Sequence, residues 1–506
     1  MTLKDLVVFD ALLVHQLEVE PRRVRAAYTL TFPDGSQSER ELIYSYGAAY
    51  FDAKDARDVN LASMMVVQVA LNYGLFCKKL IFDGLFDATD RRFLADMLEN
   101  TSREILTNKI WIDNPFLLEA YRNIVPERKK DYTAATLEFR NTKFGALKLE
   151  AEHAETLPDH FAILSSGGKD SLLAYGLVSE MGVPHPVFVN EAGRHWFTAV
   201  NAHRYLADRD ANTAKPWCNS DRLFNWMLQQ MPFIRKDFAE VRADIYPIRL
   251  WTVAVFLFGV LPVARKRRAG NILIGNEYDT TVTGEREGIR HYNGLYDQSK
   301  YFDNALTRYY DRKGWNIHQY SMLRCLSELL ILKILVKRYP ELQRQQVSCH
   351  AAHELDGRMV PCGRCEKCRR IIGMLVALEE DPRRCGYTPE QIEMGLADLS
   401  KRSVKQIGSD AAHLYHLLLA SGNLPDTEHV RRLAKAYPRI MQLRFDRERS
   451  AMEDLPVAIR RPLMALLYPY SDGCALRRDG HWQEAGLQDL EYDIPYKPLN
   501  SKDHAN

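Results

Sequence analysis

Apolar and polar positions alternate with different rhythms in successive parts of the chain. Within residues 1–140, strand-like and helical patterns are mixed: VRAAYTLTF (24–32), RELIYSYGAAYF (40–51), LASMMVVQVALNYGLF (61–76) and DRRFLADMLENT (90–101). These patterns predict an N-terminal α+β domain. The charged, proline-containing segment 141–159 is expected to connect it to the next domain.

From residue 160 the pattern changes to strands that alternate with helices. The expected elements are the strand 161–165, a helix from Ser171, the strands 186–190 and 271–277 and an apolar helix 249–264. A long helical pattern follows over 320–342, and its helix is expected to stop at Pro340. Ile-, Leu- and Val-rich strands alternating with helices predict an α/β fold with a doubly wound parallel sheet over 160–385. Residues 386–506 are expected to form a helical C-terminal region with a loose end.

Composition changes this picture little. The chain of 506 residues is too long for one core, and 46% hydrophobic and 26% charged residues are typical of a globular protein. A net charge of +2 makes nucleic acid an unlikely partner. The first residues carry no secretory signal, and the longest apolar run, 251–264, is shorter than the roughly 20 residues of a membrane span. We therefore expect a cytoplasmic protein without a membrane partner; a homo-oligomer is possible.

The stretch SSGGKDS (165–171) stands at the predicted carboxyl end of a strand, where open parallel sheets bind ligands. Gly167 and Gly168 allow a close backbone approach, and amides at the start of a helix favour an anion. Lys169 adds positive charge, whereas Asp170 would repel a bare anion and therefore suggests a bridging Mg²⁺. The plainer alternative is a strand–helix turn in which Asp-Ser caps the helix.

This loop does not fit the Walker pattern but resembles the S-G-G-x-D-S loop of the PP-loop ATP pyrophosphatases. The resemblance implies an adenine nucleotide alpha hydrolase-like fold. It also implies that the loop holds the β,γ-pyrophosphate of ATP while an acceptor oxygen attacks the α-phosphorus. The ATP-binding residues would then be Ser165, Ser166, Gly167, Gly168, Lys169, Asp170 and Ser171, with catalytic roles for Lys169 and Asp170.

Four cysteines have metal-ligand spacing: Cys349, Cys362, Cys365 and Cys368. Four thiolates satisfy tetrahedral Zn²⁺, and we expect a closed structural site without chemistry of its own. His350 or His353 could replace one thiolate. An iron–sulfur cluster and unligated thiols are the alternatives. A PP-loop followed by this signature resembles 7-cyano-7-deazaguanine synthase, which adenylates a deazapurine carboxylate.

The segment between the loop and the cysteines resembles another PP-loop family, the ATP-dependent muramoyl-alanyl-glutamate epimerases. The similarity lies in NEYDTT (276–281), QSK (298–300) and YSMLRCLSEL (320–329), and NYGLFCKKLIF (72–82) resembles a family helix ending in an aromatic–Lys pair. It implies adenylation of a terminal glutamate, which acidifies the Cα–H for epimerisation. YDTT and GLYDQSK stand where that family has a Ser-Ala-Ser-like run and an Asn-His opening, so the substrate pocket is expected to differ.

Three further residues have candidate catalytic roles. Glu277 could hold Mg²⁺ or a substrate amine, Lys300 could neutralise a carboxylate or act as a base, and Arg324 could clamp a carboxylate. Each has a structural alternative: a helix cap for Glu277, a solvated helix start for Lys300, and an i,i+4 pair with Glu328 for Arg324. Asp279 and Asp297 are weaker candidates.

The sequence thus leads to an enzyme that adenylates a small-molecule carboxylate with ATP and Mg²⁺, releasing pyrophosphate, with epimerisation of a muramoyl peptide glutamate as one outcome. A nitrile- or amide-forming ligase acting on a deazapurine carboxylate is the second hypothesis. A non-catalytic nucleotide-sensing or RNA-contacting module is the third, and the intact S-G-G-K-D-S loop and near-neutral charge argue against it.

Overall fold

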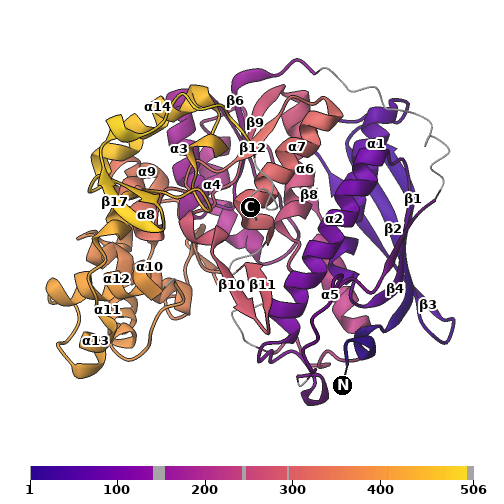
Figure 1. Ribbon diagram of the computed structural model, residues 1–506, viewed down its shortest axis with the longest axis horizontal. Helices are drawn as coiled ribbons and strands as arrows, with labels where there is room; N and C mark the ends of the chain where they lie inside the picture. Colours follow the sequence, from indigo (N-terminus) through magenta and orange to yellow (C-terminus); the bar gives the residue numbers. More distant parts are fainter. Residues whose placement is uncertain are drawn as a thin grey trace.

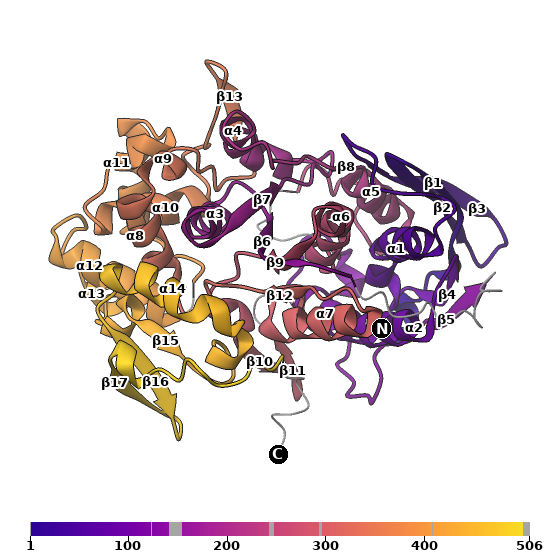
Figure 2. The same cartoon turned by 90° about the horizontal axis from the view of Figure 1, so that it is seen from above.

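The computed structural model describes residues 2–122, 124–140, 154–241, 247–292, 296–406 and 408–498. Two sheets with helices between them form the centre of the molecule (Figures 1 and 2). A second set of helices and the C-terminal region cover the far face of the inner sheet. The connector expected at 141–159 falls largely outside the described residues, except from Ala154 onward.

The outer sheet has six strands in the order β5-β4-β1-β2-β3-β8. They are β1 (Phe9–Glu20), β2 (Arg23–Thr31), β3 (Gln37–Ser45), β4 (Cys77–Asp83), β5 (Thr136–Arg140) and β8 (Trp217–Cys218). Strands β1, β4 and β5 are parallel to each other, and β1, β2, β3 and β8 follow antiparallel. Its helices are α1 (Ala56–Val67) and α2 (Ala88–Ile105). The mixture of strands and helices predicted for the first 140 residues is present.

One helix expected in this part is replaced by a strand. The family likeness predicts a helix over 72–82, but only a 3-10 turn ending at Tyr73 is helical, and β4 begins at Cys77. Lys78 and Lys79 are exposed, whereas Leu80 to Phe82 are buried between β1 and β5. Burial between two neighbouring strands overrides the local helical pattern.

The inner sheet confirms the predicted α/β class with parallel strands. Its order is β12-β9-β6-β7, all parallel, with β6 (Leu157–Leu164), β7 (Val183–Val187), β9 (Ala269–Leu273) and β12 (His318–Tyr320). Helix α6 (Val253–Lys266) packs on the face toward the outer sheet, and α3 (Lys169–Met181) packs on the other (Figure 2). Because β6 has β7 on one side and β9 on the other, the chain reverses its direction of winding at β6.

The helix predicted over 320–342 is shorter than expected. Tyr320 belongs to β12, a turn comes next, and α8 (Glu328–Arg338) begins only after Ser327, whose side chain accepts a hydrogen bond from the amide of Leu330. The serine cap therefore fixes the start of the helix. The remaining helices are α4 (His195–Ala207), α5 (Ser220–Gln230), α7 (Lys300–Lys313), α9 (Pro340–Gln343), α10 (Glu366–Ala377), α11 (Pro389–Leu399), α12 (Gly408–Ala420), α13 (Glu428–Leu433) and α14 (Val457–Leu467).

The C-terminal region is not only helical. Its helices are joined by a three-stranded sheet of β15 (Leu443–Phe445), β16 (Cys474–Arg478) and β17 (His481–Ala485). Two hairpins complete the fold: β10 (Thr283–Arg286) with β11 (Ile289–Tyr292), and β13 (His353–Leu355) with β14 (Arg358–Val360).

Two hydrophobic clusters meet at the inner sheet. Ala162 belongs to the cluster shared with the outer sheet, whereas its neighbours Phe161 and Ile163 belong to the cluster shared with α3, α8 and the C-terminal region. This alternation results from the pleat of β6, since successive side chains point to opposite faces. Within the described parts of the chain, none of the helices is both long and apolar enough to cross a bilayer.

Candidate functional site

The loop 165–168 lies at the carboxyl end of β6, at the point where the inner sheet reverses its winding. β7 and β9 flank β6 on opposite sides, so the loop lies at the topological switch point of the sheet. Ligands of open parallel sheets bind in this position. Gly168 has extended backbone angles and stands directly before α3, so the loop leads straight into a helix N-terminus.

Two glycines let the backbone pass closely here. Gly167 has φ +73°, and a Cβ there would overlap the carbonyl oxygen of Thr198 and approach Cα of Ala199 to 2.8 Å. A Cβ on Gly275, beyond the end of β9, would lie 2.7 Å from Cβ of Asp170. These positions require glycine because the neighbouring atoms are largely backbone.

The amides of the loop are not used by the fold. The amide of Ser165 donates to the carbonyl of Val187, and the next one that donates is Leu172, to Gly168. Among the described residues, the amides of 166–171 have no protein acceptor. Ser166 is exposed, and Gly168 and Asp170 are half-buried. The unbonded amides therefore form the positive end of the α3 dipole at an accessible surface.

Lys169 is buried and surrounded by carboxylates. Its Nζ lies 2.8 Å from Asp170 Oδ1, 3.3 Å from Glu277 Oε2 and 3.4 Å from Glu328 Oε1. These groups come from three elements, namely the start of α3, the end of the β9 segment and the start of α8. Of the three carboxylates, Asp170 is the most exposed, with 28% of its side chain accessible.

Mutual charge determines the ionisation of this cluster. Burial alone would lower the pKa of the Lys169 ammonium, but the surrounding carboxylates hold it well above its usual value. Burial raises the pKa of Glu277 well above its usual range and, together with Glu328, raises the pKa of Asp279 to about 6. Burial also opposes ionisation of Glu328, yet the cations Lys169 and Arg370 lower its pKa to about 2. Carboxylates thus outnumber cations at this edge of the sheet.

The ion pair expected between Arg324 and Glu328 is not formed. The sequence predicts a pair with Arg324 on one helix face, but Arg324 precedes the helix and pairs with Asp303 instead. Glu328 contacts Lys169 and, at 3.5 Å, the Nε of Arg370. Sequence reasoning assigned neither Glu328 nor Arg370 to the site. The only signal was the position of Glu328 directly after the capping Ser327.

Lys300 and Arg324 lie in closed hydrogen-bond networks of their own. Lys300 is 1% exposed, and its Nζ donates to Asp454 Oδ2 at 2.7 Å and to the carbonyl of Arg447 at 2.6 Å. Arg324 donates to the hydroxyls of Thr280 and Thr281, both at 3.1 Å, in the turn that comes after Glu277. The structure does not pair either cation with the Lys169 cluster.

Asp297 caps α6. Its Oδ2 accepts hydrogen bonds from the amides of Thr252 at 3.0 Å and Val253 at 2.8 Å, while Oδ1 is buried without a partner among the described residues. Burial raises the pKa of its carboxyl to about 7.

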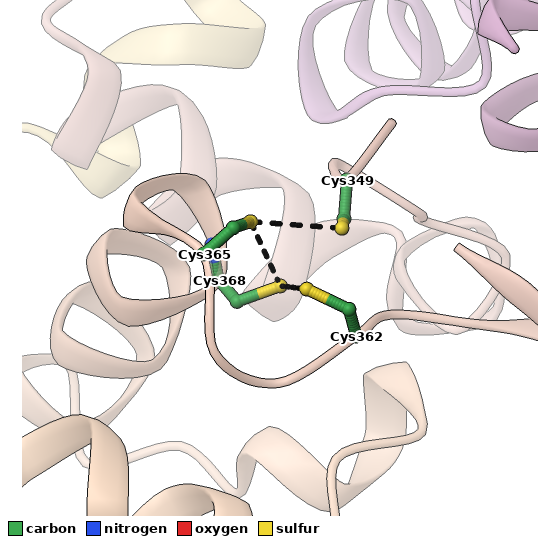
Figure 3. A group of neighbouring side chains, drawn as sticks. All are labelled: Cys349, Cys362, Cys365 and Cys368. Carbon is green, nitrogen blue, oxygen red and sulfur yellow. Dashed lines mark hydrogen bonds between the residues drawn. The ribbon is translucent and has the colours of Figure 1, made fainter. Parts of the chain in front are cut away.

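The four predicted cysteines come together (Figure 3). Their sulfur atoms all lie within 4.8 Å of one another, with Cys365 Sγ 3.6 Å from Cys349 Sγ and 3.5 Å from Cys368 Sγ, and Cys362 Sγ 3.8 Å from Cys368 Sγ. A tetrahedron with Zn–S bonds of about 2.3 Å has S···S edges of about 3.8 Å. The donor set therefore fits a metal ion such as zinc.

Local structure arranges these ligands. Cys365 is the N-cap of α10, and its Sγ accepts a hydrogen bond from the amide of Cys368 at 3.5 Å, which favours a thiolate. Gly363 has φ +73°, and a Cβ there would overlap the side chain of Gln391. Because Arg370 lies on α10, the centre also fixes the helix that carries one counter-ion of Glu328.

Comparisons of the chain with protein-family models, curated proteins and solved structures found no match. The role of the site is therefore inferred from its own geometry.

Proposed function

We propose that the loop 165–171 binds the phosphates of ATP and that the protein uses ATP to activate a substrate carboxylate, releasing pyrophosphate. One observation carries this proposal: the amides of 166–171 have no acceptor within the described part of the chain, and they lie at the N-terminus of α3, at the switch point of a parallel sheet. Lys169 is the first residue of this helix. Such amides bind anions without rearrangement, because no protein bond has to break.

The carboxylates beside the loop support a requirement for Mg²⁺. A triphosphate that approaches Asp170, Glu277 and Asp279 would be repelled unless a divalent cation lies between them. Asp170 and Glu277 would hold this cation, which would neutralise phosphate charge. Carboxylate oxygens are its preferred ligands, so the residues present fit the ion.

The chain's own residues would act by position and charge. The loop amides and Lys169 would stabilise the negative charge that develops on the departing pyrophosphate. An oxygen of the substrate carboxylate would form a bond to the α-phosphorus of ATP. The bond between the α-phosphorus and the oxygen that bridges to the β-phosphorus would break, and this oxygen would leave as part of pyrophosphate. Glu328 and Arg370 would hold Lys169 in place from the α8 and α10 sides. They act as positioning residues.

Isotope exchange between labelled pyrophosphate and ATP tests the proposal. Protein, ATP, Mg²⁺ and a panel of carboxylic acids are incubated, and exchange is expected only with an acid that the protein accepts. The matched control lacks Mg²⁺ and should show no exchange. Binding of ATP without exchange for any acid in the panel would remove the activation step.

Two further measurements distinguish the reactions that an activated carboxylate could undergo. An epimerase would exchange the substrate Cα proton with deuterated solvent and would need no amine. A nitrile- or amide-forming ligase would release AMP only with ammonia or another amine. The Cys₄ centre is the observation that keeps the ligase in consideration, because the sequence resemblance to 7-cyano-7-deazaguanine synthase includes it.

A further inference from the structure

Arg444 is a buried arginine whose hydrogen-bonding capacity is largely unused. The residue is 5% exposed, and its Nε and Nη2 atoms are buried without a hydrogen-bond partner among the described residues. One carboxylate oxygen, Asp410 Oδ1, lies 3.8 Å from Nη2, beyond hydrogen-bond distance. Arg324, which is also 5% exposed, donates four hydrogen bonds. A buried cation with unbonded N–H groups is costly, so its presence points to a partner that binds from outside the chain.

A second guanidinium lies over the same aromatic ring. The Cζ of Arg444 is 3.9 Å from the ring centroid of Tyr278, and the Cζ of Arg449 is 5.2 Å from that centroid. Arg449 is half-buried, and within the described part of the chain its guanidinium forms neither a hydrogen bond nor an ion pair. The ring attracts both cations, but their like charges repel each other at this separation. An anion that contacts both would remove this repulsion.

The carboxylates in contact with this group do not balance its cations. Asp446 Oδ2 accepts hydrogen bonds from the hydroxyl of Tyr278 at 3.2 Å and from Nη1 of Arg477 at 3.1 Å. Asp410 is the other carboxylate, and burial raises the pKa of its carboxyl although the charge of Arg444 opposes this shift. With Arg449, three guanidinium groups therefore share two carboxylates around the ring.

The backbone places this group beside the carboxylates around Lys169. Tyr278 directly follows Glu277, whose Oε2 lies 3.3 Å from the Nζ of Lys169. The amides of Tyr278 and Arg444 donate to the carbonyls of the adjacent residues 326 and 325, at 3.0 Å and 2.9 Å. This turn leads into α8, which contributes another carboxylate to the cluster. The C-terminal region thus brings two arginines to the edge of the sheet at which the loop lies.

We propose that Arg444 and Arg449, over the ring of Tyr278, form an anion-binding subsite that holds a carboxylate or phosphate group of the acceptor molecule. The anion bridges the two guanidinium groups, whose planar forks match such oxygen pairs. The C-terminal region would then select acceptors with a second anionic group in addition to the carboxylate that is activated. The identification of this anion as part of the acceptor rests on the proposed function, whereas the subsite itself does not.

Binding of simple anions, without ATP, tests the subsite. Glutarate and inorganic phosphate are titrated into the whole chain at constant ionic strength with chloride, and thermal unfolding and heat of binding are recorded. At least one of the two anions should bind saturably and raise the unfolding temperature of the wild type. The anion that binds more tightly identifies the group as carboxylate or phosphate. Because the loop 165–171 would also bind phosphate under the proposed function, variants assign the binding to one of the two places.

Arg449→Met is the decisive variant and Arg461→Met its control. Arg461 lies in the same C-terminal region and is also a cation over a tyrosine, with its Cζ 4.5 Å from the ring centroid of Tyr492. Arg449→Met should bind the anion at least tenfold more weakly, because one of two guanidinium ligands is lost, and Arg461→Met should bind like the wild type. Arg444→Lys keeps the charge without the planar fork and should also weaken binding. Failure of both anions to saturate in the wild type, or an unchanged affinity in Arg449→Met, would overturn the subsite.

A measurement on the wild type covers a variant that does not fold. Phenylglyoxal modifies accessible arginines, and peptide mass spectrometry reads each arginine separately. The bound anion should slow modification of Arg449 at least fivefold and leave Arg461 unchanged; equal rates with and without anion would contradict the proposal. Anion binding at the subsite without any pyrophosphate exchange would remove the proposed function and retain the subsite, and exchange without anion binding would do the reverse.

Discussion

Lys169 and Lys300 are both buried lysines at the first residue of a helix, yet their surroundings differ in one respect. Lys300 is enclosed: its Nζ donates to Asp454 and to a backbone carbonyl, and Asn304 donates to the other carboxylate oxygen of Asp454 at 3.1 Å. Lys169 lies among three carboxylates beside amides that have no acceptor among the described residues. A completed network holds two parts of the fold together, whereas an incomplete one is available to a ligand.

The largest effect is expected at Lys169. Lys169→Met should reduce pyrophosphate exchange by about 10³-fold, because the charge on the leaving group loses its cation in a partly buried site. Circular dichroism should report an intact fold, since the surplus carboxylates can bind protons or Mg²⁺. If Lys169→Met exchanged pyrophosphate at the wild-type rate, Lys169 would have only a structural role, like Lys300.

Lys300→Met should act on stability instead. Removal of this cation leaves Asp454 buried without its counter-charge, and the free energy of unfolding should fall by about 3–4 kcal/mol in urea denaturation. The exchange rate per folded molecule should remain near that of the wild type. If Lys300→Met lost pyrophosphate exchange at unchanged stability, Lys300 would have a functional role and not a structural one.

Glycine substitutions sharpen the view of the loop. Gly167→Ala should lower the free energy of unfolding by about 2 kcal/mol, because of its positive φ and its contact with Thr198. Gly168→Ala is the matched control: its backbone is extended and the nearest atom to a new Cβ is 3.5 Å away, so its effect should stay within about 0.5 kcal/mol. Equal effects in chemical denaturation would show that the loop adopts another conformation.

A substitution in the metal centre tests whether the four cysteines help to hold the carboxylate cluster around Lys169 in place. Cys365→Ser should release bound metal, measured by atomic emission on the purified protein, because one of four thiolates is lost. Loosening of α10 should then move Arg370 away from Glu328 and weaken ATP binding by about tenfold, or about 1.4 kcal/mol. Metal retained at one equivalent, or unchanged ATP affinity, would separate the centre from the loop.

The last prediction concerns the pH dependence of stability, which the buried carboxyl of Asp297 should influence. The folded Asp297 carboxyl keeps its proton up to a pKa of about 7, whereas the unfolded one loses it near its ordinary value of 3.8. The folded state therefore binds more protons between these values, so its stability should fall as pH rises through this window. Asp297→Asn should remove this contribution, so its free energy of unfolding relative to the wild type should be higher at pH 8 than at pH 5 by about 2–3 kcal/mol. Parallel stability profiles would contradict the raised pKa.

Local patterns explain the features that could be predicted. The parallel strands, the position of the glycine loop before a helix and the clustering of the cysteines follow from short runs of sequence. The set Cys362, Cys365 and Cys368 lies within one short run of chain, and its structure needs only one distant residue, Cys349.

Distant partners explain the features that could not be predicted. Lys300 pairs with Asp454, 154 residues away, and Arg324 pairs with Asp303, 21 residues away. The sequence next to each cation does not indicate which carboxylate it contacts. The sheet β15-β16-β17 consists of strands of three to five residues, too short for a clear alternation. Glu328 lies in the Lys169 cluster because α8 begins only after its cap Ser327, later than the helical pattern predicts.

The alternation of Phe161, Ala162 and Ile163 between the two hydrophobic clusters has a consequence for how the molecule loses its structure. If the structure around either cluster unfolded alone, one face of β6 would become exposed to water. Melting should consequently be cooperative across the whole chain, and fragments divided near residue 150 should be insoluble alone but recover when mixed.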